Sequence, residues 1–313
     1  MDKIRYSKGL KYKRLKGGGC ALVGRGRCRD EEIVVPSKVF LYGEVISIFD
    51  KAFSGDERLQ KVVLPDTVKE INESAFYNCK NLRKVRLPNG LEKLGEYAFC
   101  GCAKLRTVTL PPSLKKVSGE AFALCDQLWD INLKNVESIG VEAFYCCEKL
   151  MIADLQNLQW LSKKAFKGCT ELDCVFISEK LQGIGDAVFA GAGYHLNKKN
   201  WTKEGILYLD GWVLTTTGEN RPYKLDKNTK GIGREAFYEV YEKKKTANPT
   251  SYTEEDEWYV RFYGESPETR KKYTIDLIYP GTMEEWSKVK KSESNTKYFY
   301  KIQTTDGILE EEF

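Results

Sequence analysis

An Ala-Phe pair recurs at nearly constant spacing through the first part of the chain, and this repeat constrains the fold more than any other feature. The pairs stand at 52–53, 75–76, 98–99, 121–122, 143–144 and 165–166, with a variant, Ala-Val-Phe, at 187–189. Successive phenylalanines are therefore 22 or 23 residues apart. A unit of this length cannot enclose a core of its own, so its apolar positions must pack on the same positions of the next unit. The repeat predicts a solenoid of stacked coils.

The units share one pattern of apolar positions. Those at 65–87 and 88–110 read x-x-Leu/Val-x-x-Ile/Leu/Val-x-x-x-Ala-Phe-x-x-Cys-x-x-Leu-x-x-Val/Ile-x-Leu. The final Leu-x-x-Val-x-Leu has apolar residues at alternate positions in its second half, which indicates a short strand. Equivalent strands of successive coils are expected to run parallel, about 4.8 Å apart. The Val-x-x-Ile stretch predicts a second extended segment, and Ala-Phe-x-x-Cys predicts a turn or a single helical turn.

Stacking should place equivalent side chains in columns along the inside of the solenoid. One column is expected to hold Phe76, Phe99, Phe122 and Phe144, and a second to hold Leu82, Leu105, Leu128 and Leu150. Each coil would then contact only its neighbours, and the array would need a cap at each end.

This repeat resembles the BspA-like leucine-rich repeats of bacterial surface proteins, which also occur in treponemal leucine-rich-repeat proteins. Their hallmark, Ile-Pro-x-x-Val-x-x-Ile-x-x-x-Ala-Phe-x-x-Cys-x-x-Leu, is matched from Leu64 to Leu82 and again from Leu87 to Leu105. Residues 10–53 are similar to the amino-terminal cap of these proteins. The resemblance implies a leucine-rich-repeat solenoid, a right-handed curved array of short parallel strands with few helices.

The resemblance continues beyond the regular repeats. Residues 205–214 resemble a strand-like island inserted in such arrays, and 276–286 resemble their closing segment. We therefore expect five segments: a basic N-terminal cap (1–43), the repeats (44–190), the island (191–223), a last repeat with a polar insertion at 241–270 (224–290), and a C-terminal cap (291–313).

The sequence departs from the family where the compartment is concerned. No apolar segment follows the basic start, so a secretory signal is not recognised. No run approaches the ~18 apolar residues of a membrane span. The chain as written is expected in the cytoplasm; the alternative is export or display at the cell surface, as for family members.

Five cysteines occupy one position of the repeat, three residues after the phenylalanine. They are Cys79, Cys102, Cys125, Cys147 and Cys169. A free cysteine behaves as a small buried hydrophobic residue, so we expect a reduced column inside the solenoid, as suits a reducing compartment. For Cys20 and Cys28 two readings stay open, free thiols or, after export, a disulfide between cap strands.

Signals of catalysis are absent from the sequence. A Cys–His or Ser–His nucleophile would have to use the sole histidine, His195, which stands in a glycine-containing loop. The glycine run at 17–26 lacks the Lys-Ser/Thr of a phosphate-binding loop, and no cysteine pair has zinc-ligand spacing. We therefore expect no enzyme, no cofactor and no metal site. A hydrolase at His195 is the rejected alternative.

The strand positions between the buried residues should face outward and form a ribbon that a partner can contact. This ribbon runs from basic, through threonine, to acidic and apolar side chains. Trp, Met and Phe are typical interface anchors. The partner-binding candidates are Lys61, Arg83, Lys84, Arg86, Arg106, Trp129, Asp130, Met151, Asp154 and Phe176. Whether 191–223 and 241–270 cover this ribbon stays open.

Two kinds of partner follow from these features. The first hypothesis is a non-enzymatic scaffold, expected to be a monomer, that binds a protein or glycan through the ribbon. The alternative is an anion- or nucleic-acid-binding module, because residues 1–30 carry ten basic and two acidic side chains, a net charge of +8. Salt separates the two, since nucleic-acid affinity falls steeply as salt rises.

Overall fold

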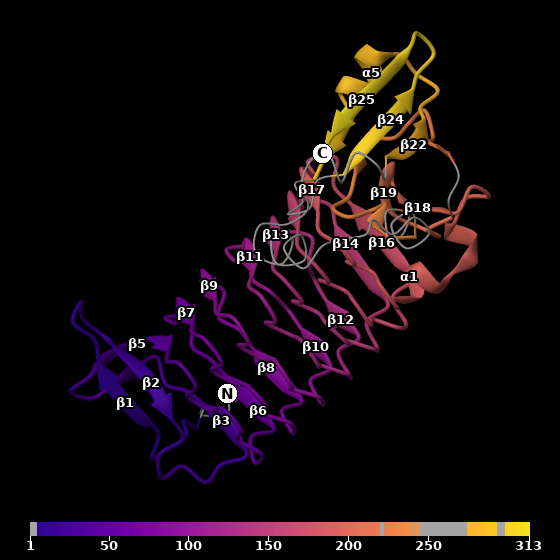
Figure 1. Ribbon diagram of the computed structural model, residues 1–313. Helices are drawn as coiled ribbons and strands as arrows, with labels where there is room; N and C mark the ends of the chain where they lie inside the picture. The colour runs from indigo at the N-terminus through magenta and orange to yellow at the C-terminus, as the bar shows by residue number, and fades with distance from the viewer. Residues whose placement is uncertain (1–4, 220–221, 239, 241, 244–273, 293–297) are drawn as a thin grey trace, which may run out of the picture. The chain divides into compact units, whose positions relative to one another are not determined.

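The computed structural model describes residues 5–219, 222–238, 240, 242–243, 274–292 and 298–313 (Figure 1). The chain forms two compact units, unit 1 (Met1–Leu181 and Val188–Leu196) and unit 2 (Gln182–Ala187 and Asn197–Phe313). The expected insertion at 241–270 lies outside the described residues, apart from 242–243. The five segments expected from the sequence stay a prediction.

Unit 1 begins with a small cap of antiparallel strands. β1 (Lys11–Arg14) pairs with β2 (Cys20–Gly24), and β4 (Lys38–Val39) pairs with β5 (Gly43–Ile48). β2 and β5 run parallel, and β5 continues into the repeats through β7 (Glu70–Ile71). The cap thus supplies the first edge on which the repeats stack.

Two ladders of short parallel strands run along unit 1, as the sequence predicts (Figure 1). The main ladder comes from the Leu-x-x-Val-x-Leu segments and contains β3 (Glu32–Val34), β6 (Lys61–Val63), β8 (Lys84–Arg86), β10 (Thr107–Val108) and β12 (Asp130–Ile131), followed by the separate pair β14 (Ile152–Leu155) and β16 (Cys174–Ile177). The second comes from the Val-x-x-Ile segments and contains β7, β9 (Lys93–Leu94), β11 (Lys116–Val117), β13 (Ser138–Ile139) and β15 (Trp160–Leu161). Both predicted extended segments are therefore confirmed.

The Ala-Phe-x-x-Cys segments form turns and not helical turns. In each coil the residue before the alanine is left-handed, as at Ser74 (φ 54°) and Tyr97 (φ 58°), and so is the residue before the cysteine, as at Asn78 (φ 55°). These turns bond to the next coil: the N–H of Phe76 donates to Ala98 O at 2.8 Å. Coil-to-coil hydrogen bonds thus extend around the turn as well as along the strands.

The interior of unit 1 is a stack of phenylalanine rings. The seven rings at 53, 76, 99, 122, 144, 166 and 189 are buried, and neighbouring ring centroids lie 5.0–5.6 Å apart with planes within 6° of parallel. Offset stacking of this kind adds to the apolar burial of each ring. The phenylalanine column predicted from the repeat is confirmed, and so is the solenoid.

Unit 2 is built from a different set of sheets. β18 (Ile206–Leu209) and β19 (Trp212–Thr216) form an antiparallel hairpin, and β19, β21 (Gly231–Ile232) and β23 (Lys290–Lys291) run parallel. A second sheet has the order β20 (Tyr223–Lys224), β22 (Ile275–Ile278), β24 (Phe299–Gln303), β25 (Ile308–Glu312). The short strand β17 (Gly183–Ile184) also belongs to this unit.

The core of unit 2 is aromatic, but its rings do not form one continuous stack: Tyr300 stacks on Phe313, with ring centroids 4.1 Å apart. Tyr223, Phe237 and Tyr300 meet edge to face, and the indole N–H of Trp286 donates to Glu311 at 2.8 Å. Trp286 comes from α5 (Met283–Ser287), whose start is fixed by a capping box between Thr282 and Glu285. Helix is otherwise scarce in the described part of the chain, where α1 (Gly193–Leu196) and the 3-10 turn η1 (Lys198–Asn200) are single turns.

Candidate functional site

The outward side chains of the main ladder form a surface on unit 1 in two parts, one on β6 to β12 and one on β14 and β16. We call strand face the outward residues of β6, β8, β10, β12, β14 and β16 together with the residue that precedes each strand. In register, Lys84 lies between Lys61 and Thr107, and Thr107 lies beside Asp130. The preceding residues also follow one another, because the N–H of Trp129 donates to Arg106 O at 3.0 Å. The row inferred from sequence spacing is therefore a row in the structure.

The strand face is interrupted once. β10 and β12 pair, and β14 and β16 pair, with Ile152 beside Cys174 and Asp154 beside Phe176. β12 and β14 belong to separate sheets. The step from Phe122 to Phe144, which spans this break, is the first of 22 residues instead of 23.

The basic end of the strand face is partly neutralised. Lys61 pairs with Glu32 at 2.8 Å and Arg86 pairs with Asp66 at 3.3 Å. A hydrogen bond from the backbone of Asn89, followed by the Arg86 charge, lowers the pKa of Asp66. The charge of this end is therefore lower than the sequence suggested, because the predicted ribbon did not include Glu32 of β3 or Asp66 of the neighbouring loop.

Three cations of the strand face have no carboxylate partner. Arg83, Lys84 and Arg106 are exposed and form no ion pair within the described residues. They lie on adjacent coils, so their repulsion is relieved best by an anionic group brought from outside. The attraction for anions therefore centres on these three residues.

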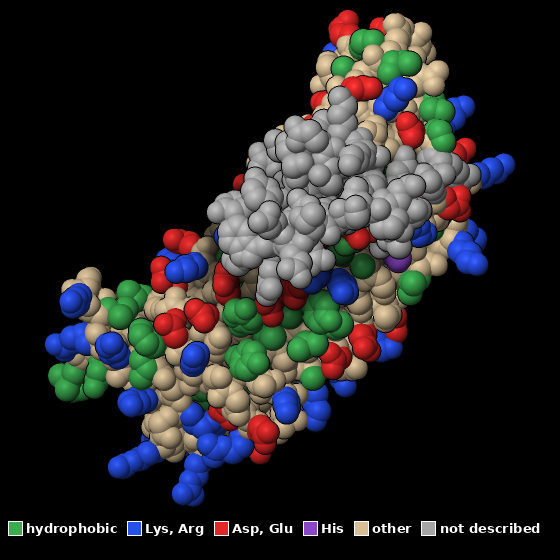
Figure 2. Space-filling model, viewed as in Figure 1, with side chains coloured by type: hydrophobic (Ala, Val, Ile, Leu, Met, Phe, Trp, Pro, Cys, Tyr) green, Lys and Arg blue, Asp and Glu red, His purple; other side chains and the backbone are tan. Residues whose placement is uncertain are grey.

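The other end of the strand face exposes large apolar side chains. Trp129, Met151, Ile152 and Phe176 are each about half exposed, with exposed fractions of 48, 46, 53 and 55%. On the face drawn in Figure 2, hydrophobic side chains gather between the charged ones over the middle coils of unit 1. Asp154 is half-buried, and its Oδ1 has no hydrogen-bond partner among the described residues.

Two neighbouring hollows lie beside the preceding residues of β10 and β12. The first, about 500 Å³, is lined by Arg83, Ala103, Lys104, Arg106, Asp126 and Gln127. The second, about 360 Å³, is lined by Arg106, Gln127, Trp129, Lys149, Met151 and Glu171. Arg106 and Gln127 belong to both, so the hollows form one line whose lining residues come from five successive coils.

Sequence reasoning missed six of the ten residues that line these hollows. Lys104, Gln127 and Lys149 occupy the variable positions of the Cys-x-x-Leu segment. The residue at each of these positions varies from coil to coil, as it does at the outward strand positions. Only the strand positions, however, were predicted to face outward. Burial and the Glu148 charge raise the pKa of Asp126, in that order, and a hydrogen bond to Glu171 raises the pKa of Lys149.

The thiols of the cysteine column are unsuited to nucleophilic chemistry. All ten cysteines are free, and those of the column are buried. Burial raises the pKa of Cys169 to about 12 and that of Cys102 well above its usual range. A thiol with such a pKa stays protonated, and the thiol is a poor nucleophile. Cys20 and Cys28 are likewise buried and unpaired, so the free-thiol reading holds in this structure.

The described residues contain no group of three or more His, Cys, Asp or Glu side chains that could hold a metal ion. His195 lies in α1, where burial lowers its pKa. A search of the same residues for a helix long and apolar enough to cross a membrane finds none.

Comparison with known proteins agrees with the stacked coils. Residues 46–159, 121–213 and 153–259 match the sequence model of a family described as BspA type Leucine rich repeat region (6 copies). No curated protein matches significantly.

Three solved structures resemble the chain. The T. pallidum leucine rich repeat protein TpLRR has 26% identity and a TM-score of 0.54, with 63% of this chain and 92% of that one covered. A leucine-rich repeat protein from Bacteroides ovatus has 22% identity and a TM-score of 0.54, with 76 and 62% covered. A leucine-rich repeat protein from Eubacterium ventriosum has 21% identity and a TM-score of 0.51, with 63% of this chain and 53% of that one covered. The chain thus spans about three fifths of the Bacteroides ovatus protein and about half of the Eubacterium ventriosum protein. These two likenesses show the fold alone.

Proposed function

Because the chain belongs to the BspA-type leucine-rich-repeat family, we propose that it is a non-enzymatic scaffold that binds a protein or glycan partner through the strand face. The observation that carries this proposal is the row of half-exposed Trp129, Met151 and Ile152 beside a hollow that also contains Arg106 and Lys149. Large apolar anchors next to charged and amide groups are typical of interface centres.

The backbone beneath these anchors is fixed before any partner arrives. Trp129 and Met151 each precede a strand of a hydrogen-bonded ladder, and the coils below them are held by the stacked rings. Binding would then order few groups, and little free energy would be lost to conformational entropy. The apolar end is therefore the proposed source of affinity.

The basic end has a different proposed role. Arg83, Lys84 and Arg106 lie at the rim of the apolar row, where charge steers association and selects among partners more than it adds affinity. An acidic segment of the partner would match them, and Asp130 with Asp154 would disfavour a uniformly acidic one. The proposed contact residues are those expected from the sequence, Lys61, Arg83, Lys84, Arg86, Arg106, Trp129, Asp130, Met151, Asp154 and Phe176, joined by Gln127 and Lys149.

We infer a reducing compartment and a monomer as the setting of this function. The ten free cysteines suit a reducing environment. The alternative is display at the cell surface, which predicts that an antibody against unit 1 binds to intact cells. Fractionation of the native cells and sedimentation of the purified chain test the two statements separately.

The test is a comparison of matched variants in affinity capture from the native host. Trp129→Ser with Met151→Ser removes two anchors of the strand face, and Trp160→Ser removes a tryptophan that is 55% exposed on β15 of the other ladder. We expect the same partner to be captured by wild type and Trp160→Ser and lost by the double variant. Equal capture by all three would contradict the proposal.

A salt titration of the captured complex tests the nucleic-acid alternative. Affinity that rests on phosphate contacts falls by orders of magnitude between low and physiological salt, whereas an apolar contact changes little. A steep loss, together with nucleic acid in the eluate, would replace the proposed partner with an anionic polymer.

A further inference from the structure

A second exposed apolar surface lies on the cap of unit 1, away from the main ladder. We call hairpin tip the residues Phe40, Leu41 and Tyr42, which connect β4 to β5. Their exposed fractions are 87, 70 and 40%. Phe40 is thus the most exposed large hydrophobic side chain among the described residues. Single exposed apolar residues are ordinary, but three in succession at a protruding turn indicate a contact with something outside the chain.

The hairpin holds these side chains outward by its own hydrogen bonds. Val39 pairs with Gly43 across the two strands, and the N–H of Tyr42 donates to Val39 O at 3.0 Å. Leu41 is left-handed, with φ 67°, a conformation that leucine adopts at a cost. Glycine or asparagine would fit the backbone of this turn better.

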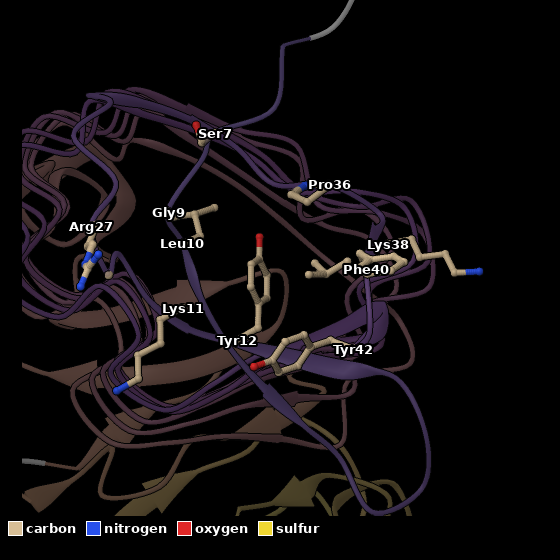
Figure 3. A pocket seen from close by; sticks show the side chains of 12 residues that line it. Ser7, Gly9, Leu10, Lys11, Tyr12, Arg27, Pro36, Lys38, Phe40 and Tyr42 are labelled. Carbon is tan, nitrogen blue, oxygen red and sulfur yellow. The ribbon is translucent and has the colours of Figure 1, made fainter.

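Basic side chains surround the hairpin tip. The guanidinium of Arg14, on β1, donates to Leu41 O. Lys11, Arg27 and Lys38 line the same cleft of about 820 Å³ as Phe40 and Tyr42, and no acidic side chain lines it among the described residues. Figure 3 shows Tyr12, Phe40 and Tyr42 around this cleft, with Lys11 and Arg27 on one side and Lys38 on the other.

The charge of the cap as a whole has the same sign. Residues 5–44 carry ten basic and four acidic side chains. One of these acids, Glu44, lies opposite Lys38 in the hairpin. The remaining excess of positive charge faces no compensating acidic cluster in the cleft.

We propose that the cap docks on an anionic lipid bilayer, with Phe40 and Leu41 at the boundary between headgroups and acyl chains. Tyr42 would lie at headgroup level, where amphipathic aromatic rings are enriched. Lys11, Arg14 and Lys38 would contact the anionic headgroups. An apolar tip combined with several cations is the two-part signal that reversible membrane binding requires.

A bilayer fits this surface better than a protein or nucleic acid does. A bilayer can cover the three exposed side chains of the tip at once. A nucleic-acid duplex held by its phosphates would use the cations and leave Phe40 and Leu41 in water. A second copy of the chain would bring another basic cap against the first, and like charges would oppose the contact.

The experiment is co-sedimentation of the full chain with phosphatidylcholine vesicles that contain or lack phosphatidylglycerol. Phe40→Ser with Leu41→Asn removes the apolar tip and leaves a residue that tolerates the left-handed turn. Lys11→Gln with Lys38→Gln removes two charges. Trp160→Ser is the matched control, because it removes an exposed aromatic side chain from a strand far from the cap. Circular dichroism checks that each variant is folded.

We expect binding to the anionic vesicles only, weakened when salt shortens the Debye length from about 10 Å at 0.1 M to about 3 Å at 1 M. The charge variant should bind about 25-fold more weakly, about five-fold for each cation. The tip variant should lose at least about ten-fold, as expected when two large apolar side chains no longer leave water. The control should bind like wild type.

Three results would overturn the proposal. One is the absence of binding to anionic vesicles. Another is binding to anionic vesicles that the tip variant retains in full. It would indicate a purely electrostatic contact, of the kind that the cap could also make with nucleic acid. The third is self-association that the tip variant abolishes without any vesicle binding, which would assign the tip to a second copy.

Discussion

The thiol of Cys102 donates a hydrogen bond to the carbonyl oxygen of Phe76, 3.2 Å away in the preceding coil. The same contact recurs along the column, from Cys79 to Cys169, at 3.1–3.2 Å. Each of these thiols is buried. The recurring cysteine therefore combines small volume with a donor for a carbonyl that faces the interior of the solenoid.

Cys102→Ala should lower the free energy of unfolding by about 1–2 kcal/mol, because it removes a buried donor and leaves a small cavity. The measurement is urea unfolding followed by circular dichroism. Cys174→Ala is the control, since Cys174 is exposed on β16, and its effect should stay within about 0.5 kcal/mol. Equal effects at the two positions would contradict a structural role for the column.

The cysteine column should make the protein less stable at alkaline pH. Burial raises the pKa of Cys169 to about 12 from an ordinary value of 9.0. The stabilising effect is complete below pH 9 and is lost as pH rises from there toward 12, because only the unfolded chain releases the proton. The free energy of unfolding should fall by about 1.4 kcal/mol per pH unit for each such thiol.

The measurement is urea unfolding at several pH values between neutral and alkaline, for wild type and for Cys169→Ala. The difference between the two chains isolates this thiol from the tyrosines and lysines that titrate in the same range. The wild type should lose stability more steeply than the variant above pH 9. Parallel curves would show that Cys169 ionises freely in the folded state.

Inward and outward aromatic residues should differ sharply in their effect on stability. Phe99→Ala removes a fully buried ring between Phe76 and Phe122 and should cost about 3–5 kcal/mol. Trp129→Ala removes a side chain that is 48% exposed and should cost about 1 kcal/mol or less. Chemical unfolding of both variants gives the comparison, and similar losses would mean that the facing assignment is wrong.

The sequence predicted the repeat architecture because stacking makes each apolar position of the template a column. The spacing of Phe76 and Phe99 fixed which residues meet, and the same argument placed Lys61, Lys84 and Thr107 in one row. Periodicity alone was enough for both statements, since every coil has the same length within one residue.

The backbone of the turns could not be predicted in the same way. The left-handed position before the alanine carries Ser74, Tyr97 and Glu120 in successive coils, and the one before the cysteine carries Asn78, Gly101 and Leu124. Asparagine and glycine tolerate this conformation, but the other four residues do not favour it. Hydrogen bonds to the next coil hold them there. Tertiary contacts, which no local pattern records, thus decide the turn.

The residues of the candidate site on and next to the strands were predicted from the sequence, and those in the turns beside them were not. Trp129 and Met151 were predicted as the residues that flank the outward strand positions. Gln127 and Lys149 were not, because they belong to the preceding turn, and the pairing of Arg86 with Asp66 joins the last strand of a unit to the loop at the start of the same unit. Contacts between non-equivalent positions lie outside what a repeat pattern can predict.

The central claim is that the strand face contacts the partner, and the most direct measurement is site-specific photo-crosslinking in the native host. A photoreactive phenylalanine analogue placed at position 129 should yield a discrete crosslinked partner, and the same analogue at position 160, on the other ladder, should not. A crosslink from position 160 but not from 129, or no crosslink from 129 while the partner is still captured, would contradict the account.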